Sequence, residues 1–203
     1  MKASVLLPAL LVLSITSLTA WDRSPITTVR PLVWQASADA EKVNACTTWP
    51  TVYRDRVVWV TALHCVVGEN GLVDEQWIFK IDGKPATVLK ANPEHDLVML
   101  TGPSKRALRV SFLSPSPLDP VWTVGFPGGN DRPYVTAGVL SLVRDEGGRA
   151  VWNTGAASGM SGSPVLDKEG FVVGIIQQIL CSPHGFCPMS RGVGVSELHA
   201  FLT

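Results

Sequence analysis

The sequence has no excess of either charge. Its 17 lysines and arginines are balanced by 17 aspartates and glutamates, and no stretch concentrates one sign. Nucleic acids and anionic membrane surfaces attract clustered positive charge, so neither is expected as a partner. A charged fraction of 17% beside a hydrophobic fraction of 46% is typical of a folded protein rather than a disordered one. At 203 residues the chain is long enough for one domain, or for two small halves that share a core.

Long apolar runs are missing after the N-terminus, which argues against membrane-spanning helices in the rest of the chain. The first 20 residues combine an early cation at Lys2, an apolar run from Val5 to about Ile15 and small residues ending at Ala20. This order is typical of a secretory signal peptide, and the run is too short to cross a bilayer comfortably. We therefore expect residues 1–20 to be a signal peptide and the protein to be secreted or periplasmic, without stable membrane insertion once the signal is removed. A retained N-terminal anchor is the alternative.

Cysteine is scarce, and its spacing disfavours a metal site. The four cysteines, Cys46, Cys65, Cys181 and Cys187, include no C-x-x-C pair. We expect no metal and no other cofactor. An even number of cysteines in an exported chain favours disulfides over free thiols. Of the possible pairings, the spacing favours Cys46–Cys65 and Cys181–Cys187, because each bridge then stays within one region of the chain.

Helical patterning is almost absent. Only the C-terminal stretch SELHAFLT (196–203) predicts a helix, with Ser196 as N-cap and Glu197 in the first turn. Elsewhere, short β-branched and apolar runs alternate with turns that contain glycine, proline or asparagine. The expected strands span residues 56–63, 76–81, 86–91, 96–102, 121–126, 134–143, 150–155, 163–167, 171–180 and 192–196.

A proline-rich stretch, LSPSPLDP (113–120), divides these strands into two sets, because proline cannot join the interior of a sheet. We expect an N-terminal half over residues 21–112, a linker over 113–120 and a C-terminal half over 121–203. Short strands at this spacing, with scattered glycines, predict two all-β barrels or sandwiches rather than an alternating α/β fold.

The stretch GMSGSPV (159–165) holds a candidate nucleophile, Ser161. A serine hydroxyl reacts only when a base lies within hydrogen-bond reach and a third group orients that base. His64 ends the strand VVWVTALHC and Asp96 opens the strand DLVML, so both can be held rigidly at strand ends. Their chain order, His64 then Asp96 then Ser161, differs from the order in α/β-hydrolases and in subtilisins.

An α/β-hydrolase would instead use Ser161, Asp167 and His184. Two observations argue against it. The G-x-S-x-G elbow is absent, because Ser163 replaces its second glycine, and the alternating helices and parallel strands of that fold are missing. We assign His95, His184 and His199 to structural or surface positions.

Three stretches, TALHC (61–65), HDLVML (95–100) and GMSGSPV (159–165), resemble the motifs of the chymotrypsin-like serine peptidases. The resemblance runs from about Cys46 to Leu202 and favours the bacterial members of glutamyl-endopeptidase and high-temperature-requirement type. It implies two six-stranded antiparallel β-barrels with a short C-terminal helix, and a secreted serine endopeptidase that acts on polypeptides.

The resemblance also implies a role for each site residue. His64 would be the general base and then the acid, Asp96 would orient it, and Ser161 would be the nucleophile. The backbone N–H groups of Gly159 and Ser161 would form the oxyanion hole. Gly159 lacks a Cβ, so it can adopt the backbone geometry that points its N–H at the substrate.

The sequence departs from the digestive members of the family at two places. Met160 replaces the aspartate that pairs with a newly cut N-terminus, so we expect no zymogen switch of that type. The substrate pocket, expected at Gly155, Ile176 and Gln178, carries no charge. It lacks the aspartate of trypsin-type pockets and, at Ile176, the histidine of glutamyl endopeptidases. A neutral, medium-sized side chain is therefore the expected substrate residue.

Two alternatives to a peptidase stay open. One is a catalytically silent binding protein on the same scaffold, and the other is an esterase that shares the mechanism. The oligomeric state is not encoded in any motif, and we favour a monomer.

Overall fold

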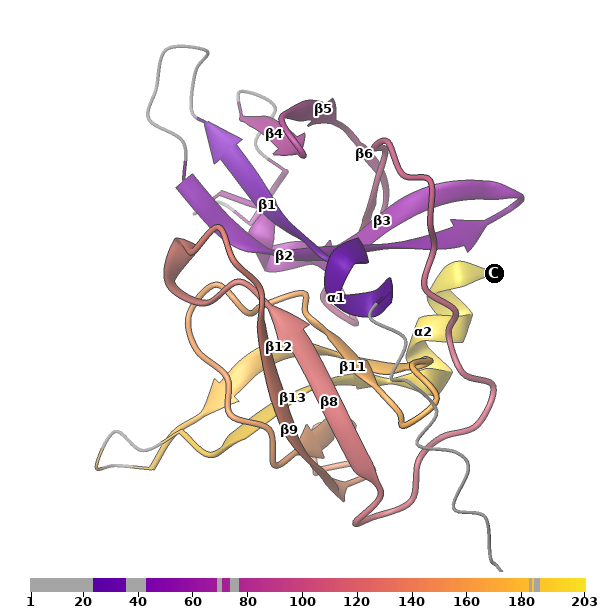
Figure 1. Ribbon diagram of the computed structural model, residues 1–203, viewed down its shortest axis with the longest axis vertical. Coiled ribbons are helices and arrows are strands. Elements are labelled where there is room, and N and C mark those ends of the chain that lie inside the picture. The colour runs from indigo at the N-terminus through magenta and orange to yellow at the C-terminus, as the bar shows by residue number, and fades with distance from the viewer. Residues whose placement is uncertain (1–23, 36–42, 69–70, 74–76, 183, 185–186) are drawn as a thin grey trace, which may run out of the picture.

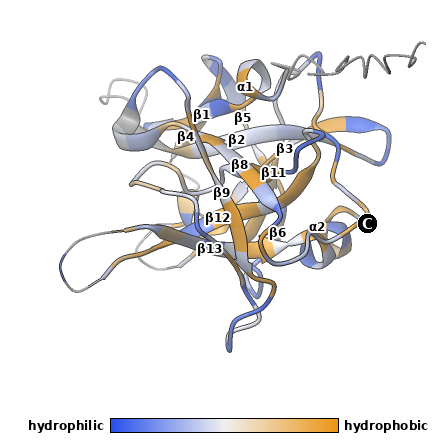
Figure 2. Ribbon diagram, turned by 60° about the horizontal axis from the view of Figure 1, so that its bottom comes forward, coloured by the Kyte–Doolittle hydropathy of each residue, from blue (hydrophilic) through white to orange (hydrophobic). Residues whose placement is uncertain are grey.

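The computed structural model describes residues 24–35, 43–68, 71–73, 77–182, 184 and 187–203 (Figure 1). The predicted signal peptide, residues 1–20, lies outside them. The described chain forms two β-sheet halves that pack against each other, the N-terminal half above and the C-terminal half below in Figure 1. Figure 2 shows hydrophobic residues gathered on the central strands and hydrophilic residues on the outer turns.

The N-terminal half is a curled sheet of seven antiparallel strands in the order β5-β4-β1-β2-β3-β7-β6. Its strand β2 is 11 residues long, so it pairs with β1 along its first part and with β3 along its second. Arg54 and Asp55 turn β2 into β3 with φ of 47° and 62°, the geometry that suits a two-residue hairpin. The bounds are Arg30–Gln35 (β1), Val43–Tyr53 (β2), Arg56–Ala62 (β3), Ile78–Ile81 (β4), Lys84–Ala86 (β5), Val88–Asn92 (β6) and Leu97–Leu100 (β7).

The C-terminal half is a closed barrel of six strands in the order β10-β13-β12-β11-β8-β9. A barrel has no unpaired edge along its closed part, and its inward side chains fill the interior. Here Trp152, Leu140 and Val165 are among the residues of that interior. The bounds are Pro120–Gly125 (β8), Tyr134–Leu142 (β9), Ala150–Trp152 (β10), Pro164–Leu166 (β11), Val172–Leu180 (β12) and Met189–Gly194 (β13).

The two halves share one core. A single buried cluster takes side chains from both: Trp49, Val60, Leu97 and Met99 from the N-terminal sheet, and Val124, Leu166, Ile175, Leu198 and Phe201 from the C-terminal half. Burying a large apolar side chain contributes about 1.5–3 kcal/mol. The shared cluster therefore fixes how the halves dock, and with it the position of any site built between them.

Two short helices flank the sheets. Helix α1 (Ser24–Thr28) precedes β1, and helix α2 (Val195–Leu202) follows β13 and buries Leu198 and Phe201. The Lys90 ammonium, on β6, donates a 2.6 Å hydrogen bond to the carbonyl of Phe201, so α2 is tied to the N-terminal sheet. Among the described residues, no helix is long and apolar enough to cross a membrane.

The predicted all-β, chymotrypsin-like fold with a C-terminal helix is confirmed. The structure refines it, because the N-terminal half is a curled seven-stranded sheet in place of a closed six-stranded barrel. Helix α2 begins at Val195 with Gly194 as its N-cap and no side-chain cap, so the prediction of Ser196 as N-cap is wrong. Strands β1 and β2 were not predicted, since neither shows the simple apolar alternation of the other strands.

Candidate active site

The end of β3 places His64 beside Asp96. Strand β3 pairs with β7 up to Ala62 and Leu97, so the residues just beyond these partners meet at the same sheet edge. His64 lies in a single 3-10 turn, Leu63–Cys65. Its backbone N–H donates to Asp96 Oδ1 at 2.8 Å, and its ring Nδ1 lies 2.7 Å from Asp96 Oδ2. One carboxylate thus holds both the main chain and the ring of the histidine.

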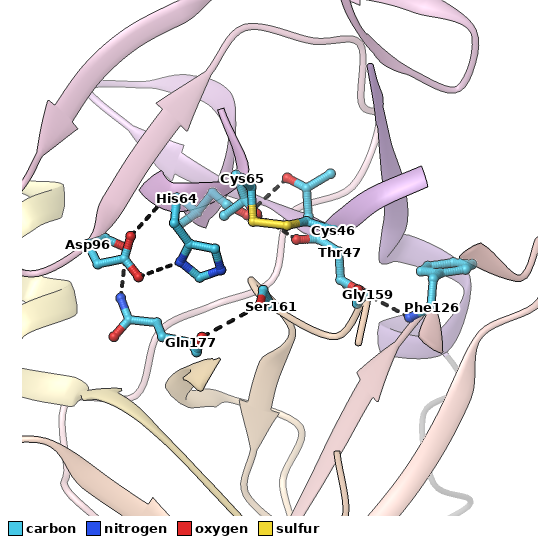
Figure 3. Close-up of a disulfide and its surroundings, with 12 residues drawn as sticks. Cys46, Thr47, His64, Cys65, Asp96, Phe126, Gly159, Ser161 and Gln177 are labelled. Carbon is cyan, nitrogen blue, oxygen red and sulfur yellow. Dashed lines mark hydrogen bonds and ion pairs between the residues drawn. A yellow bond between two sulfur atoms is a disulfide. The ribbon is translucent and has the colours of Figure 1, made fainter. Parts of the chain in front are cut away.

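The contact with Asp96 determines which nitrogen of the His64 imidazole carries the proton. A carboxylate only accepts hydrogen bonds, so Nδ1 carries the ring proton in the contact with Asp96. The other nitrogen, Nε2, keeps its lone pair and faces the side where Ser161 lies (Figure 3). The His64 side chain is 43% exposed and the Asp96 side chain 25% exposed, so the imidazole is more accessible than the carboxylate that holds it.

Asp96 is held in an unusual backbone conformation. Its φ is 51°, in the left-handed region that costs energy for a residue with a Cβ. The Gln177 side-chain amide spans the two halves and donates to the carbonyls of His95 at 2.6 Å and Asp96 at 2.7 Å. Gln177 is 4% exposed, so these bonds are shielded from water.

Arg149 completes this clamp on the turn that carries Asp96. Its guanidinium donates to Gln177 Oε1 at 2.9 Å, to the His95 carbonyl at 3.0 Å and to the Glu94 carbonyl at 3.2 Å. The backbone N–H of Arg149 in turn donates to Asp145, and this bond is the main cause that holds the pKa of Asp145 below its ordinary value. The C-terminal barrel therefore fixes the turn of the N-terminal sheet.

Ser161 lies in the loop between β10 and β11, and Thr47 of β2 anchors that loop. The Thr47 N–H donates to the Ser161 carbonyl at 2.8 Å, and its hydroxyl donates to the Gly159 carbonyl at 3.0 Å. The same hydroxyl accepts from the Phe126 N–H at 3.0 Å. Thr47 thus links the N-terminal sheet to two parts of the C-terminal half, the loop of Ser161 and Phe126 (Figure 3).

Two glycines allow the chain to pass this closely. Gly159 has φ of 90°, and a Cβ there would lie 2.5 Å from the Phe126 carbonyl oxygen. Gly162 has φ of 85°, and a Cβ there would lie 2.1 Å from the Thr47 carbonyl oxygen. Both positions exclude any larger residue unless the backbone moves.

Backbone donors of this loop are left open toward the cleft. Within the described residues, the N–H groups of Gly159 and Ser161 donate to no protein acceptor, whereas Met160 N–H bonds Ala157 and Gly162 N–H bonds Ile176. Two neighbouring free N–H groups beside a hydroxyl are the arrangement that stabilises an oxyanion. The Ser161 hydroxyl itself donates a long bond of 3.5 Å to the Gln177 carbonyl.

A cleft of about 520 Å³ contains these groups, between the two halves. Of the predicted pocket residues, Gln178 lines it, but Gly155 and Ile176 do not. Gly155 is exposed, and its carbonyl accepts from the Thr136 hydroxyl, while Ile176 is 1% exposed in the barrel interior. The pocket assignment stays a prediction. The full lining is Trp34, Cys46, His64, Cys65, Val67, Trp77, Ser158, Gly159, Ser161, Gln178 and Ile179.

Residues 51–175 match the family model of the trypsin-like peptidase domain, and this segment includes His64, Asp96 and Ser161. The chain belongs to the trypsin-like peptidases. No curated protein sequence is similar enough to count as a match.

Solved structures of this fold agree with the assignment. The Rv3671c protease from M. tuberculosis in its active form has a TM-score of 0.67 at 18% identity, over 88% of this chain and 81% of that one. The MamO protease domain from Magnetospirillum magneticum has a TM-score of 0.67 at 18% identity, over 89% and 98%. The HtrA-type protease AlgW with a decapeptide has a TM-score of 0.68 at 17% identity, over 87% of this chain and 63% of that one. This chain spans less than two thirds of AlgW, and at these identities the likeness shows the fold alone.

The two predicted disulfides of this trypsin-like peptidase are confirmed. Cys46 bonds Cys65 and Cys181 bonds Cys187. The first bridge lies beside His64, and the donor atoms of the three residues lie within 4.8 Å of one another. Because both sulfurs are used in the disulfide, they offer no thiolate to a metal.

Three further residues named in the sequence analysis, Met160, Asp167 and His199, do not line the cleft. Met160 is 2% exposed, where the digestive members of the family carry a charged partner for an N-terminus. The Asp167 carboxylate accepts the N–H groups of Glu169 and Phe171 in the β11–β12 turn, so it orients no histidine. His199 bonds the Ser111 carbonyl and stacks on Phe112.

Sequence reasoning missed Gln177 and Arg149, which hold the turn that carries Asp96, and Thr47, which holds the loop that carries Ser161. Each acts across the boundary between halves, and no local pattern signals such contacts. Ser158 and Ile179 also line the cleft and were not predicted. The available signal was that they directly adjoin Gly159 and Gln178 in the sequence.

Proposed function

We propose that this trypsin-like peptidase is an exported serine endopeptidase that works through an acyl-enzyme on Ser161. The observation that carries the proposal is the double contact between His64 and Asp96, which leaves Nε2 free on the side of Ser161. The two open N–H groups of the same loop support it. Both disulfides, together with the predicted signal peptide, support an oxidising, extracytoplasmic location.

In the proposed first step, Ser161 Oγ attacks the carbonyl carbon of a peptide bond while His64 Nε2 accepts the hydroxyl proton. The negative charge that develops on the carbonyl oxygen is stabilised by the N–H groups of Gly159 and Ser161, each worth about 10²–10³ in rate. The imidazolium formed is stabilised by Asp96.

In the next steps, His64 gives its proton to the amine of the leaving fragment and the C–N bond breaks. Water then attacks the ester on Ser161 by the same route, with His64 again as base, and releases the acid. Each of the three side chains makes at least one hydrogen bond to the protein in the absence of substrate, which supports the proposed mechanism because it limits their motion before the reaction.

The test is covalent labelling of the folded protein by a fluorophosphonate, followed by peptide mass spectrometry. We expect a single adduct on Ser161, none in Ser161→Ala, and labelling slowed by about 10²–10⁴-fold in His64→Ala, the range assigned to a general base. Folded protein that stays unlabelled would falsify the proposal. A peptide library then separates cleavage within chains, expected after a neutral side chain, from esterase activity alone.

The second candidate is a binding protein that acylates without turnover. An activated ester distinguishes the two, because a peptidase releases product continuously whereas a silent scaffold releases one equivalent and stops. N-terminal sequencing of exported protein tests the remaining part of the proposal, and we expect the first residue to lie near Trp21.

A further inference from the structure

Trp34 and Trp77 form a stacked pair in the wall of the catalytic cleft. Trp34 lies in β1, and Trp77 directly precedes β4, the strand that pairs with β1. The ring centroids are 4.4 Å apart and the planes differ by 15°, while Phe79 meets Trp77 edge-on at 6.2 Å. Both tryptophans are only half-buried, so this aromatic surface is open to a ligand.

This pair lines the same cleft as His64 and Ser161. Val67 and the Cys46–Cys65 disulfide line the same cleft. The described residues that line this cleft include no aspartate, glutamate, lysine or arginine. The wall therefore favours an aromatic or large apolar group over a charged one.

The free edge of β12 indicates where the acyl part of a substrate binds, and so which part is left for the tryptophans. Strand β12 pairs with β13 as far as Leu180, but with β11 only as far as Ile175. Its edge at Gln178 and Ile179 is therefore unpaired by β11 where it lines the cleft. An extended peptide can add to such an edge as a further strand, which places the acyl part of the substrate along β12, in the C-terminal half.

The tryptophans belong to the opposite, N-terminal half of the protein, the half that carries His64. His64 must deliver its proton to the leaving amine, so the leaving fragment runs along that half. We propose that the Trp34–Trp77 pair binds an aromatic or large apolar side chain in the leaving fragment, and so selects substrates with such a residue just after the cut bond. This inference rests on the proposed peptidase function, and it names the class of residue that the enzyme accepts in the leaving fragment.

Acyl transfer to added amines tests the leaving-group side alone. An N-blocked alanine p-nitrophenyl ester acylates Ser161, and the acyl group then passes either to water or to an added amino-acid amide. In the second case the amine nitrogen attacks the acyl carbon, His64 takes a proton from the nitrogen, and the ester bond breaks as Ser161 Oγ is reprotonated. Chromatography gives the ratio of amide to acid product for phenylalaninamide, leucinamide, glycinamide and glutamic acid amide.

We expect phenylalaninamide and leucinamide to capture the acyl group on the order of tenfold better than glycinamide, the scale of one aromatic contact with its buried area. In Trp77→Ala and in Trp34→Ala with Trp77→Ala, phenylalaninamide and leucinamide should capture the acyl group no better than glycinamide does. The ratio of amide to acid product is taken within each variant, so a change in its overall ester hydrolysis does not affect the comparison. Trp77→Phe keeps a ring and should keep most of the preference. Phe112→Ala removes an aromatic side chain that is 88% exposed and lines no part of this cleft, so it serves as the control.

The outcomes separate the two proposals. If the ester acylates no residue in folded protein, the peptidase function fails and this inference fails with it. If the ester turns over but all four amides capture the acyl group equally, only the inference fails. It also fails if the preference for phenylalaninamide survives in the double variant. Should Trp77→Ala not fold, as judged by its fluorophosphonate labelling rate, Trp77→Phe compared with Trp77→Leu gives the same readout.

Discussion

The side-chain amide of Gln177, in the C-terminal barrel, donates a 2.7 Å hydrogen bond to the main-chain carbonyl of Asp96, in the N-terminal sheet. The bond fixes the backbone of a residue whose φ of 51° is unfavourable on its own. The orientation of the Asp96 carboxylate toward His64 is thus set from the other half of the molecule.

Removing this clamp should lower activity more than stability. In Gln177→Ala, the turn that carries Asp96 loses the hydrogen bonds to the carbonyls of His95 and Asp96. A shift of about 1 Å costs on the order of 10²-fold in rate. We expect Ser161 labelling by a fluorophosphonate to slow by about 10- to 100-fold, with a smaller loss in Arg149→Lys, which keeps the charge but not the planar fork. Arg144→Ala breaks an exposed ion pair with Glu197 and should label at the wild-type rate. A folded Gln177→Ala variant that labels normally would contradict the assignment.

Gly159→Ala should impair the oxyanion site. The new methyl group would lie 2.5 Å from the Phe126 carbonyl oxygen, at a φ of 90° that alanine resists. The N–H of this residue must then turn away, which costs about 10²–10³ in acylation rate. Ester kinetics measure the loss, and thermal unfolding should report about 1–3 kcal/mol of strain. Gly194→Ala is the matched control, since its methyl group would meet its nearest atom at 3.7 Å. Equal acylation rates for the two variants would exclude this role of Gly159.

The two disulfides should contribute differently to the free energy of unfolding. Cys46–Cys65 closes a separation of 19 residues and Cys181–Cys187 one of 6. Loop entropy predicts a loss of about 3 kcal/mol for the paired alanine variant of the first bridge and about 2 kcal/mol for the second. Denaturant unfolding measures both. Only the first variant should also slow labelling of Ser161, because only that bridge adjoins His64. A larger loss from the shorter loop would show that strain or packing, not loop closure, dominates.

Stability should depend on pH through Asp167. Burial of this carboxyl raises its pKa above the ordinary value of 3.8, against the hydrogen bonds from Phe171 and Glu169. The folded chain therefore binds the proton more tightly than the unfolded chain. The cost of the charged form is absent below pH 3.8, grows as pH rises through the raised pKa and is constant above it.

Asp167→Asn keeps the accepting oxygen for both N–H groups and removes the charge. We expect its thermal midpoint at neutral pH to rise by no more than about 2 °C, because solvent screens this half-exposed site. The difference between variant and wild type should vanish below pH 4, within about the ordinary carboxyl range. A variant that is less stable than wild type at neutral pH would contradict the assigned cause.

The sequence predicted what depends on local pattern and on short motifs. The strand ends that carry His64 and Asp96 and the glycines that flank Ser161 are each recognisable in a short stretch of sequence. The structure brings His64, Ser161 and the Cys46–Cys65 bridge to one cleft, with Asp96 bonded to His64. Strand β2 was missed because Pro50 and paired threonines interrupt its apolar pattern. Its Pro50 nevertheless pairs with Trp59 and accepts the N–H of Leu108 through its carbonyl.

The lining of the cleft could not be predicted to the same degree, for a geometric reason. The pairing of β12 with β13 shifts register between Ile176 and Gln178. Along β12 the residues from Val172 to Gln177 are all buried and Gln178 is exposed, so burial does not alternate and gives no simple sign of which side chains reach the cleft. Contacts such as Arg149 with the Glu94 carbonyl span 55 residues, and they follow from how the halves dock rather than from any local signal.

His64 and Asp96 belong to one half of the molecule, and Ser161 and Gly159 to the other. Neither half contains the whole proposed set of reacting groups. In the proposed mechanism, the Ser161 hydroxyl therefore becomes reactive only in molecules whose two halves are packed against each other. Stoichiometric titration of Ser161 would consequently count correctly assembled molecules in a preparation. It would serve as a quantitative assay of tertiary assembly that spectroscopic measures of β-content do not provide.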